Sequence, residues 1–273
     1  DDYQRGILKG HQKPIILLKR REDSMLAEQA APDNPMLGCM LPYAPVQSLI
    51  FDYDDDIKMP SCLVMTSGNL SGLPICRNDD DVRAEIRSYC DVVLTHNRKI
   101  IIRADDSVMD FYDGKPYMIR RSRGYAPLPY MMTKQFKGSV IAYGGELKNT
   151  FCVAVNSLMY PSSYIGDLTD LKGKNALKES AERMLDLLEA KPSYAVCDLH
   201  PLYNSSAAAE ESGLPLIRVQ HHYAHILSCM AENDFTEDVI GISLDGTGYG
   251  TDGTIWGGEI LKCNLDGFER AGH

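Results

Sequence analysis

The sequence predicts an α/β protein built from two domains. Its 273 residues suffice for two domains of ordinary size, and its hydrophobic and charged fractions, 44% and 24%, are those of a globular protein. Short apolar runs typical of buried strands alternate with segments of helical spacing. A proline-rich segment at 125–130 interrupts this pattern, which then restarts.

The composition argues against several classes of protein. A net charge of −10 disfavours broad electrostatic binding of nucleic acid, which needs clustered Lys and Arg. The sequence contains no run of 18 apolar residues and no signal-peptide pattern, so we expect neither a membrane span nor secretion. The eight cysteines never form a CxxC pair, which indicates reduced thiols in a cytoplasmic protein.

The first half should contain strands at 14–18, 60–65, 91–95 and 99–103, because each segment is a short apolar run. The run at 60–65 leads directly into a loop of small polar residues. A helix should begin near Asn78, which can cap it, and the acidic residues that follow favour the positive end of the helix dipole. Together these segments predict a βα unit.

We place the domain boundary within 130–138. Beyond it we predict a β-hairpin from 139–143 and 150–155, a long helix over 173–190, and strands at 194–198 and 239–245 that each finish on an acidic residue. The chain starts without Met and stops without a helix end or a polar tail, so we expect it to be truncated at both termini.

The loop that follows the apolar run at 60–65 is rich in hydroxyl and amide side chains: Thr66, Ser67, Asn69 and Ser71. With its two glycines, such a loop can direct backbone N–H groups and small donors at phosphate oxygens. A plain turn accounts for the same residues, because short patterns of this kind often arise by chance.

Two histidines, His221 and His225, stand four residues apart at the start of an expected helix. Both imidazoles would project from one face and could bind one divalent metal ion, zinc or iron. The pair lacks the Glu of the zinc-protease motif, and His222 should point elsewhere. Histidines with a purely structural role are the alternative.

A glycine-rich segment, 245–259, begins where the strand at 239–245 should end. The carboxylate of Asp245 could hold a metal ion or a metal-bound water and so act in catalysis, while the backbone of Gly246, Thr247 and Gly248 could approach phosphate. A plain glycine-rich hairpin is the alternative.

Five segments resemble the hydrogenase-maturation carbamoyltransferase family, HypF, both in amino-acid sequence and in their order along the chain: 66–74, 97–108, 120–127, 198–205 and 245–259. The resemblance covers nearly the whole chain. It implies that residues 1–134 form a YrdC-like nucleotide-binding domain with a twisted, open α/β sheet. Residues 137–273 would then form a TsaD-like carbamoyl-transfer domain with the actin-like ATPase fold, and both domains would be truncated.

The resemblance also implies further site residues. Arg103, Ser107, Arg121 and Arg123 would lie at the nucleotide pocket, where guanidinium groups suit phosphate, although in a generic protein such arginines form a solvated turn. In the second domain, a phosphate loop would contain Gly144, Gly145 and Asn149. The catalytic candidate His200 would line the transfer site beside Asp198, and a structural role at the end of the strand is the alternative for both residues. The third metal ligand would be an Asp beyond residue 273.

The family's activity implies Mg²⁺-ATP and carbamoyl phosphate as substrates and a carbamoyl adenylate as intermediate. The acceptor would be the C-terminal cysteine of HypE, where the group becomes a cyanide ligand of nickel–iron hydrogenase. One alternative is a protein of tRNA threonylcarbamoyladenosine synthesis, which shares both domain types. Another is a catalytically silent partner that binds only nucleotide or metal.

Overall fold

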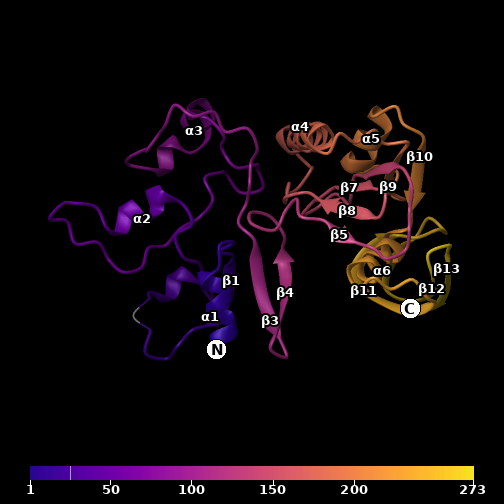
Figure 1. Cartoon of the computed structure of the whole chain (residues 1–273), viewed down its shortest axis with the longest axis horizontal. Helices are drawn as coiled ribbons and strands as arrows, with labels where there is room; N and C mark the ends of the chain where they lie inside the picture. The colour runs from indigo at the N-terminus through magenta and orange to yellow at the C-terminus, as the bar shows by residue number, and fades with distance from the viewer. Residues whose placement is uncertain (25) are drawn as a thin grey trace. The chain divides into compact units, whose positions relative to one another are not determined.

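The structure is a computed structural model that describes residues 1–24 and 26–273. The chain divides into two compact units (Figure 1). Unit 1 comprises Asp1–Leu70 and Ile75–Ala126, and unit 2 comprises Ser71–Pro74 and Pro127–His273. Within the described part of the chain, no helix is both long and apolar enough to cross a membrane. The assignment of separate roles to residues 1–134 and 137–273 stays a prediction.

Unit 1 is built on one four-stranded sheet of order β2-β1-β3-β4, in which β1 and β3 are parallel and the other pairs are antiparallel. Its elements are α1 (Asp2–Lys9), β1 (Ile15–Lys19), the short 3₁₀ helix η1 (Glu28–Ala30), β2 (Met36–Cys39), α2 (Pro45–Phe51), α3 (Asp79–Glu85), the 3₁₀ helix η2 (Arg87–Tyr89), β3 (Val108–Tyr112) and β4 (Lys115–Arg120). The strand predicted at 14–18 is β1, and the helix predicted near Asn78 is α3, whose first turn is capped by the Asn78 side chain.

Three predicted strands of unit 1 are wrong. The segments 60–65, 91–95 and 99–103 form no strand, and their apolar side chains are largely exposed, including 81% of Val64 and 78% of Leu94. A strand needs a neighbour for its backbone N–H and C=O groups. Among residues 1–24 and 26–273 no strand pairs with these segments, so apolar composition alone gives them no regular structure.

Unit 2 contains two sheets. A six-stranded sheet has the order β10-β9-β6-β7-β8-β5, and a three-stranded antiparallel sheet has the order β11-β12-β13. Its elements are β5 (Tyr130–Met131), β6 (Ser139–Ala142), β7 (Cys152–Val155), β8 (Leu158–Pro161), α4 (Leu171–Leu187), β9 (Tyr194–Asp198), α5 (Asn204–Glu211), β10 (Leu216–Val219), α6 (His221–Glu232), β11 (Val239–Tyr249), β12 (Ile255–Cys263) and β13 (Phe268–Gly272).

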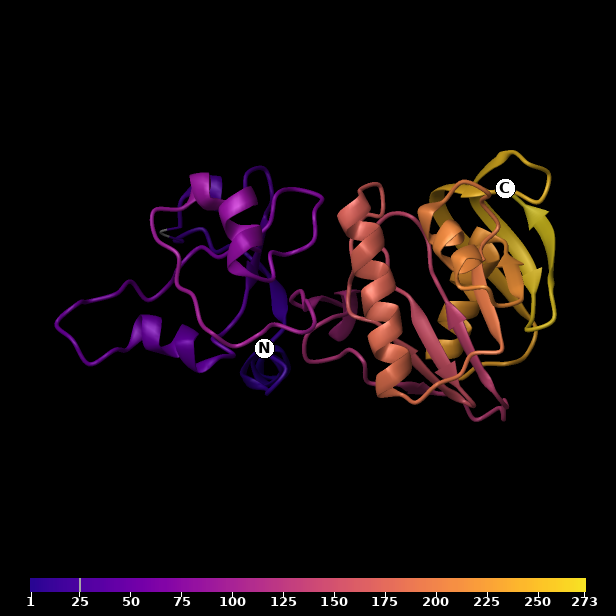
Figure 2. The ribbon, with the colours of Figure 1, turned by 90° about the horizontal axis from the view of Figure 1, so that it is seen from above.

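The larger core of unit 2 lies between the six-stranded sheet and the helices α4 and α5 (Figure 2). Ile141 and Val153 on the sheet are fully buried against Leu177 of α4, together with further apolar residues from β9 and α5. The Asp170 side chain caps α4. Gly173 allows α4 to pass close to the Asp167 carbonyl, since a Cβ there would lie 2.4 Å from that oxygen.

The predicted hairpin, long helix and two strands of the second half correspond to β6–β7, α4, β9 and β11. Strand β9 ends on Asp198 as predicted, whereas β11 runs past Asp245 to Tyr249. Strands β9 and β10 extend the hairpin sheet in parallel with β6. Both units combine helices with mixed sheets, so the predicted α/β class is confirmed. All eight cysteines are free.

Candidate functional site

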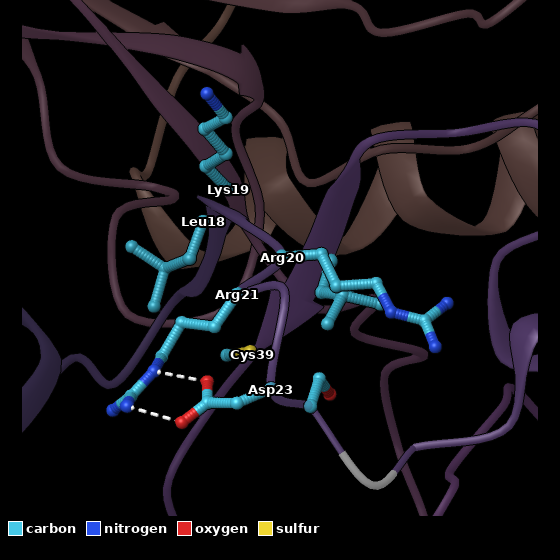
Figure 3. Close-up of a pocket in the computed structure, with 8 residues that line it drawn as sticks. Leu18, Lys19, Arg20, Arg21, Asp23 and Cys39 are labelled. Carbon is cyan, nitrogen blue, oxygen red and sulfur yellow. Dashed lines mark hydrogen bonds and ion pairs between the residues drawn. The ribbon is translucent and has the colours of Figure 1, made fainter.

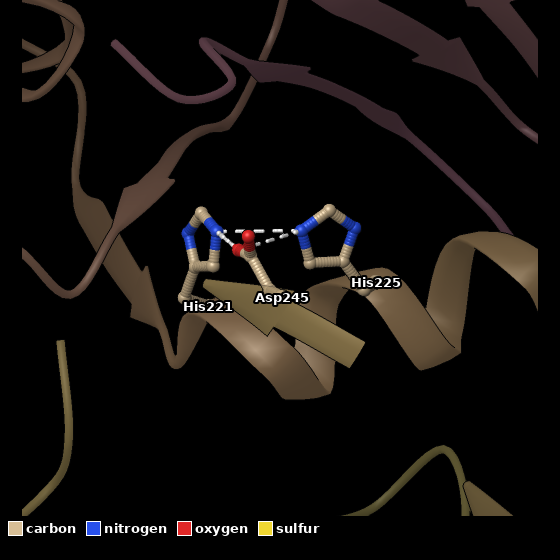
Figure 4. A group of neighbouring side chains, drawn as sticks. All are labelled: His221, His225 and Asp245. Carbon is tan, nitrogen blue, oxygen red and sulfur yellow. Dashed lines mark hydrogen bonds and ion pairs between the residues drawn. The ribbon is translucent and has the colours of Figure 1, made fainter. Parts of the chain in front are cut away.

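The side chains of His221, His225 and Asp245 converge on one point (Figure 4). The Nε2 atom of His221 lies 2.7 Å from Oδ2 of Asp245. The Nε2 atom of His225 lies 3.5 Å from the same oxygen and 3.3 Å from Nε2 of His221. The two histidines occupy one face of α6, and the carboxylate comes from β11.

This donor set fits a divalent metal ion. Zinc lies about 2.0–2.2 Å from imidazole nitrogen and carboxylate oxygen, so ligand atoms at tetrahedral angles are separated by about 3.4 Å. The separations of 3.3 and 3.5 Å that involve His225 match this value. The 2.7 Å separation between His221 and Asp245 has to widen by several tenths of an ångström. Asp245, which the sequence predicted to hold a metal ion or a metal-bound water, thus lies beside the histidine pair as a third donor within this chain.

The local fold explains why these three residues meet. The Gln220 side chain caps α6 by accepting from the Tyr223 N–H, and its amide donates to the Tyr249 carbonyl at the end of β11. The strand pairing of β11 with β12 shifts between Leu244 and Gly248, and this irregularity contains Asp245. Gly248 allows β11 to approach α6, because a Cβ there would lie 2.9 Å from the His221 ring.

His221 has a second carboxylate partner. Its Nδ1 atom lies 2.6 Å from Oδ2 of Asp198, at the end of β9. The hydrogen bond to Asp198 raises the pKa of His221, although burial opposes this shift. Burial alone would raise the pKa of Asp245, but hydrogen bonds from the Gly246 N–H and from His221 hold it below its usual value. His222 is fully buried, and burial lowers the pKa of its ring.

The predicted phosphate loop at 144–149 is stabilised by hydrogen bonds from one of its own side chains, Asn149. Asn149 is buried, and its amide donates to the carbonyls of Tyr143 at 2.9 Å and Gly145 at 2.6 Å. Gly144 has a φ of +70°, and a Cβ there would lie 2.1 Å from the Thr150 carbonyl oxygen. Asn149 therefore shapes the loop, and its amide nitrogen is already used.

The same loop is tied to α5. Glu146 accepts from the backbone N–H of Asn204 at 2.7 Å and from its side-chain amide, so a loop carboxylate caps the first turn of that helix. The residue before Asn204 is Tyr203, whose ring stacks on His200 with the centroids 4.0 Å apart.

From His200 the contacts lead to the group formed by His221, His225 and Asp245, here called the convergent triad. The His200 backbone N–H donates to Asp198 at 2.8 Å, and Asp198 in turn faces His221. The His200 ring also meets the Tyr249 ring edge-on at 5.2 Å. Consecutive contacts therefore join the loop at 144–149 to the histidine pair, and both belong to one site in unit 2.

Gly246 and Thr247 are exposed residues that follow Asp245, and the Gly246 N–H donates to its carboxylate at 2.7 Å. The segment 245–259 is an antiparallel hairpin in which β11 continues through a bulge to Tyr249 and returns as β12. The hairpin alternative considered for this segment therefore describes its backbone. Gly248, predicted to contact phosphate, instead lies against the rings of His221 and His222.

In unit 1, two predicted nucleotide-binding residues are committed to internal contacts. Arg123 donates to Asp106 at 2.7 Å and to the carbonyls of residues 12 and 13, and its guanidinium lies 3.5 Å from the Tyr43 ring centroid. Ser107 is fully buried; it donates to the Arg123 carbonyl and accepts from the Ser122 N–H. These contacts give both residues a structural function.

The remaining candidates of unit 1 are more accessible. Thr66 and Ser67 are exposed, and Asn69 is half-buried, with its amide donating to the Leu70 carbonyl. The half-buried Arg103 donates to the Ile75 carbonyl at 2.7 Å and lies 4.0 Å from Asp81. Arg121 is half-buried, and Ser71, which groups with unit 2, is exposed.

A shallow pocket of about 380 Å³ lies beside β1 and β2 in unit 1 (Figure 3). Three cationic residues, Lys19, Arg20 and Arg21, line it together with Cys39. Arg21 forms two hydrogen bonds with Asp23, at 2.9 and 2.7 Å, and Arg20 donates to the Leu26 carbonyl. Both guanidinium groups thus already have acceptors of their own.

Sequence reasoning missed three residues that position the site: Gln220, Glu146 and the Asp198 carboxylate as a partner of His221. Each acts on a residue 23 to 58 positions away. Only the acidic ends of the predicted strands, where Asp198 and Asp245 stand, hinted at this arrangement.

Family comparisons divide the chain in three. Residues 2–122 match the family described as telomere recombination, residues 135–232 match the HypF Kae1-like domain, and residues 241–273 match the second subdomain of the carbamoyltransferase Kae1-like domain.

Curated relatives match nearly the whole chain. Carbamoyltransferase HypF of Synechocystis sp. is 41% identical over 268 residues, which cover 98% of this chain and 34% of that protein. The HypF of Rhizobium leguminosarum bv. viciae is 39% identical over 275 residues, which cover 100% of this chain and 36% of that protein. The chain thus spans about a third of the length of these relatives.

Two solved structures are similar to this one. A full-length HypF in the phosphate- and nucleotide-bound form gives a TM-score of 0.91 at 44% identity, covering 99% of this chain and 42% of that chain. The HypF of T. kodakarensis gives a TM-score of 0.89 at 41% identity, covering 97% of this chain and 34% of that chain.

Proposed function

The chain belongs to the carbamoyltransferase HypF family, and on this premise we propose that it serves an ATP-dependent transfer of a carbamoyl group. The substrates are carbamoyl phosphate and Mg²⁺-ATP. The acceptor is the C-terminal cysteine thiol of HypE, whose carbamoyl group becomes a cyanide ligand of nickel–iron hydrogenase.

The first step belongs to unit 1 in this proposal. Carbamoyl phosphate is first hydrolysed, outside this unit, to carbamate and inorganic phosphate. A carbamate oxygen then attacks the α-phosphorus of ATP, the bond from that phosphorus to the oxygen bridging it to the β-phosphate breaks, and pyrophosphate leaves with the electron pair. The exposed hydroxyls of Thr66 and Ser67 and the donor of Asn69 are proposed to orient the phosphates. Arg103 and Arg121 are proposed to supply positive charge at the same phosphates.

The second step belongs to unit 2. The acceptor thiolate attacks the carbamoyl carbon, the bond from that carbon to the adenylate oxygen breaks, and AMP leaves with the electron pair. His221, His225 and Asp245 would hold a zinc or iron ion, which when bound supplies positive charge beside the carbonyl oxygen. The backbone of the exposed residues Gly246 and Thr247 is proposed to approach phosphate oxygens, with the Gly246 N–H exchanging its present acceptor, the Asp245 carboxylate, for phosphate.

His200 and the loop at 144–149 are proposed to complete the transfer site. His200 stacks on Tyr203, so its ring has a fixed orientation beside Asp198. Asn149 and Glu146 hold the loop in a shape that presents the backbone around Gly145 to a nucleotide phosphate. One observation supports the proposal above all: hydrogen bonds, a ring stack and the consecutive residues Tyr203 and Asn204 connect this loop to His221 without a break.

A chimera provides the test. We would replace the matching segment of Synechocystis HypF with this chain and incubate the chimera with ATP, carbamoyl phosphate and HypE. We expect ATP–pyrophosphate exchange that depends on carbamoyl phosphate, and carbamoylated HypE detected by intact mass. The variant Asp245→Asn should retain the exchange and lose the transfer, because only the second step uses the triad.

Two outcomes would contradict this proposal. Transfer that requires threonine and tRNA in place of HypE would support the threonylcarbamoylation alternative. A folded chimera that binds nucleotide but catalyses no exchange would support the silent partner, provided that unmodified Synechocystis HypF is active in the same assay.

A further inference from the structure

The Asp198 carboxylate is buried and has a partner for each oxygen. Its side chain is only 6% exposed, although it ends a strand. Oδ1 accepts from the backbone N–H of His200 at 2.8 Å, and Oδ2 lies 2.6 Å from Nδ1 of His221. A buried carboxylate is costly unless hydrogen bonds satisfy it, so this placement requires both contacts.

We propose that Asp198 is a positioning residue for the metal ligand His221. By accepting a hydrogen bond from the N–H at Nδ1, the carboxylate leaves Nε2 as the nitrogen available to a metal ion and fixes the direction in which it points. This inference rests on the proposed metal centre and adds a residue that would never touch the ion.

The two ring nitrogens of His221 support this assignment. Nε2 faces the convergence point, 2.7 Å from Asp245 and 3.3 Å from Nε2 of His225. Nδ1 faces away from that point, toward Asp198. A histidine ligand whose second nitrogen donates to a carboxylate has a fixed tautomer and orientation, and it is a stronger ligand for that reason.

The second histidine provides an internal contrast. The His225 side chain is 56% exposed, against 18% for His221. Among the residues that the structure describes, the His225 ring contacts only His221 and Asp245. His221 is thus fixed before a metal ion arrives, whereas His225 can adjust its side chain on binding.

The backbone that carries Asp198 is itself held in place by Ser206. The Ser206 hydroxyl, on α5, donates to the carbonyl of His200 at 3.1 Å and lies 3.5 Å from that of Asp198. Ser206 is fully buried. The end of β9 is therefore fastened to α5, so the Asp198 carboxylate reaches His221 from a rigid backbone.

The test is a zinc titration of the metal-stripped full chain, with a competing chelator, for the wild type and the variants Asp198→Asn and Asp198→Ala. We expect the Zn²⁺ affinity to fall roughly 10- to 100-fold, and further in Asp198→Ala than in Asp198→Asn, which keeps an acceptor oxygen. Asp170→Asn is the matched control, because Asn caps α4 as well as Asp does. Its Zn²⁺ affinity should equal that of the wild type.

Nitrogen-15 NMR of the histidine rings gives a second readout, which needs no variant to fold. In the zinc-loaded wild type, His221 should carry its proton on Nδ1 and bind the metal through Nε2. A His221 bound through Nδ1 would overturn the positioning role, and so would folded Asp198 variants with zinc affinities within about twofold of the wild type. A wild-type chain that binds no zinc would contradict the metal centre itself and, with it, this inference.

Discussion

His221 meets a carboxylate at each of its two ring nitrogens, Asp198 on one side and Asp245 on the other. This arrangement joins the end of β9, the start of α6 and the bulge of β11 at a single imidazole. Its neighbour His222 has a different environment: it is fully buried, with Nδ1 lying 3.1 Å from the Gln220 amide nitrogen. Adjacent histidines in one turn of helix thus have separate roles, one in the site and one in the packing behind it.

Arg123 should stabilise unit 1. Replacing it by Ala leaves a partly buried Asp106 carboxylate and two backbone carbonyls without their donors. We expect a loss of about 3 kcal/mol in the free energy of unfolding, measured by urea denaturation. The control is Arg83→Ala, which removes an exposed pair with Asp80 and should cost less than about 0.5 kcal/mol. Equal losses in the two variants would contradict the structural role of Arg123.

The pair Glu259 and Arg270 should make stability depend on pH. Two hydrogen bonds from Arg270, at 2.6 and 2.7 Å, hold the pKa of Glu259 below its usual value against the effect of burial. The contribution of this pair is therefore present above the unfolded pKa of about 4.3 and is lost as pH falls through the lower folded value.

We expect Glu259→Gln to destabilise the chain at pH 7 and to differ less from the wild type near pH 3. Urea denaturation at both pH values measures the difference. Glu269→Gln, at an exposed position on β13, is the control and should change stability little at either pH. A destabilisation by Glu259→Gln that is the same at both pH values would show that packing, and not the ion pair, accounts for it.

At the scale of elements, the bulge of β11 and the start of α6 determine the site. The variant Gly248→Ala would place a Cβ 2.5 Å from the His222 ring and 2.9 Å from the His221 ring, so β11 or α6 would have to move. We expect the Zn²⁺ affinity to fall about tenfold or more. Gly267→Ala, in the turn before β13, meets no atom within 4 Å and should bind zinc like the wild type. Unchanged zinc affinity in Gly248→Ala would show that the close approach of β11 to α6 at this glycine does not determine the metal site.

The elements that were predicted correctly are those whose pattern is local. The helix α4 has its own cap and a repeating apolar face, and the hairpin β6–β7 has alternating burial with a Gly-Gly turn. The segments 60–65, 91–95 and 99–103 failed, because an apolar run does not reveal whether another strand lies beside it. The sequence predicted that both Gly246 and Gly248 would approach phosphate. In the structure Gly246 is exposed, whereas Gly248 is packed against His221 and His222.

The site was predictable only in part for the same reason. The spacing of His221 and His225 is a property of one helix, so their common face could be predicted. The contacts of Glu146 with Asn204 and of Asp198 with His221 depend on the order of strands in the sheet. That order cannot be read from spacing along the chain.

For the whole molecule, the two units differ in their cores. Among the described apolar side chains of unit 1, only those of Pro14, Ile16 and Met109 are buried, whereas unit 2 has two apolar clusters. Because buried apolar area is the main stabilising contribution, unit 1 should unfold at the lower temperature. Scanning calorimetry of the full chain should therefore show two transitions.

Zinc should raise only the upper of these transitions, because the triad lies entirely in unit 2. At a free zinc concentration of 100 times Kd, the expected stabilisation is about 2.7 kcal/mol. EDTA should reverse it. A single transition, or a zinc effect confined to the lower one, would contradict this division of the chain.

The central claim is that His221, His225 and Asp245 form one metal centre. Its most direct test is the anomalous difference map of a zinc-soaked crystal of the full chain, recorded at the zinc absorption edge. We predict one dominant peak about 2.0–2.2 Å from Nε2 of His221, Nε2 of His225 and Oδ2 of Asp245. A map with no peak at these three atoms, or with its dominant peak elsewhere on the chain, would contradict it.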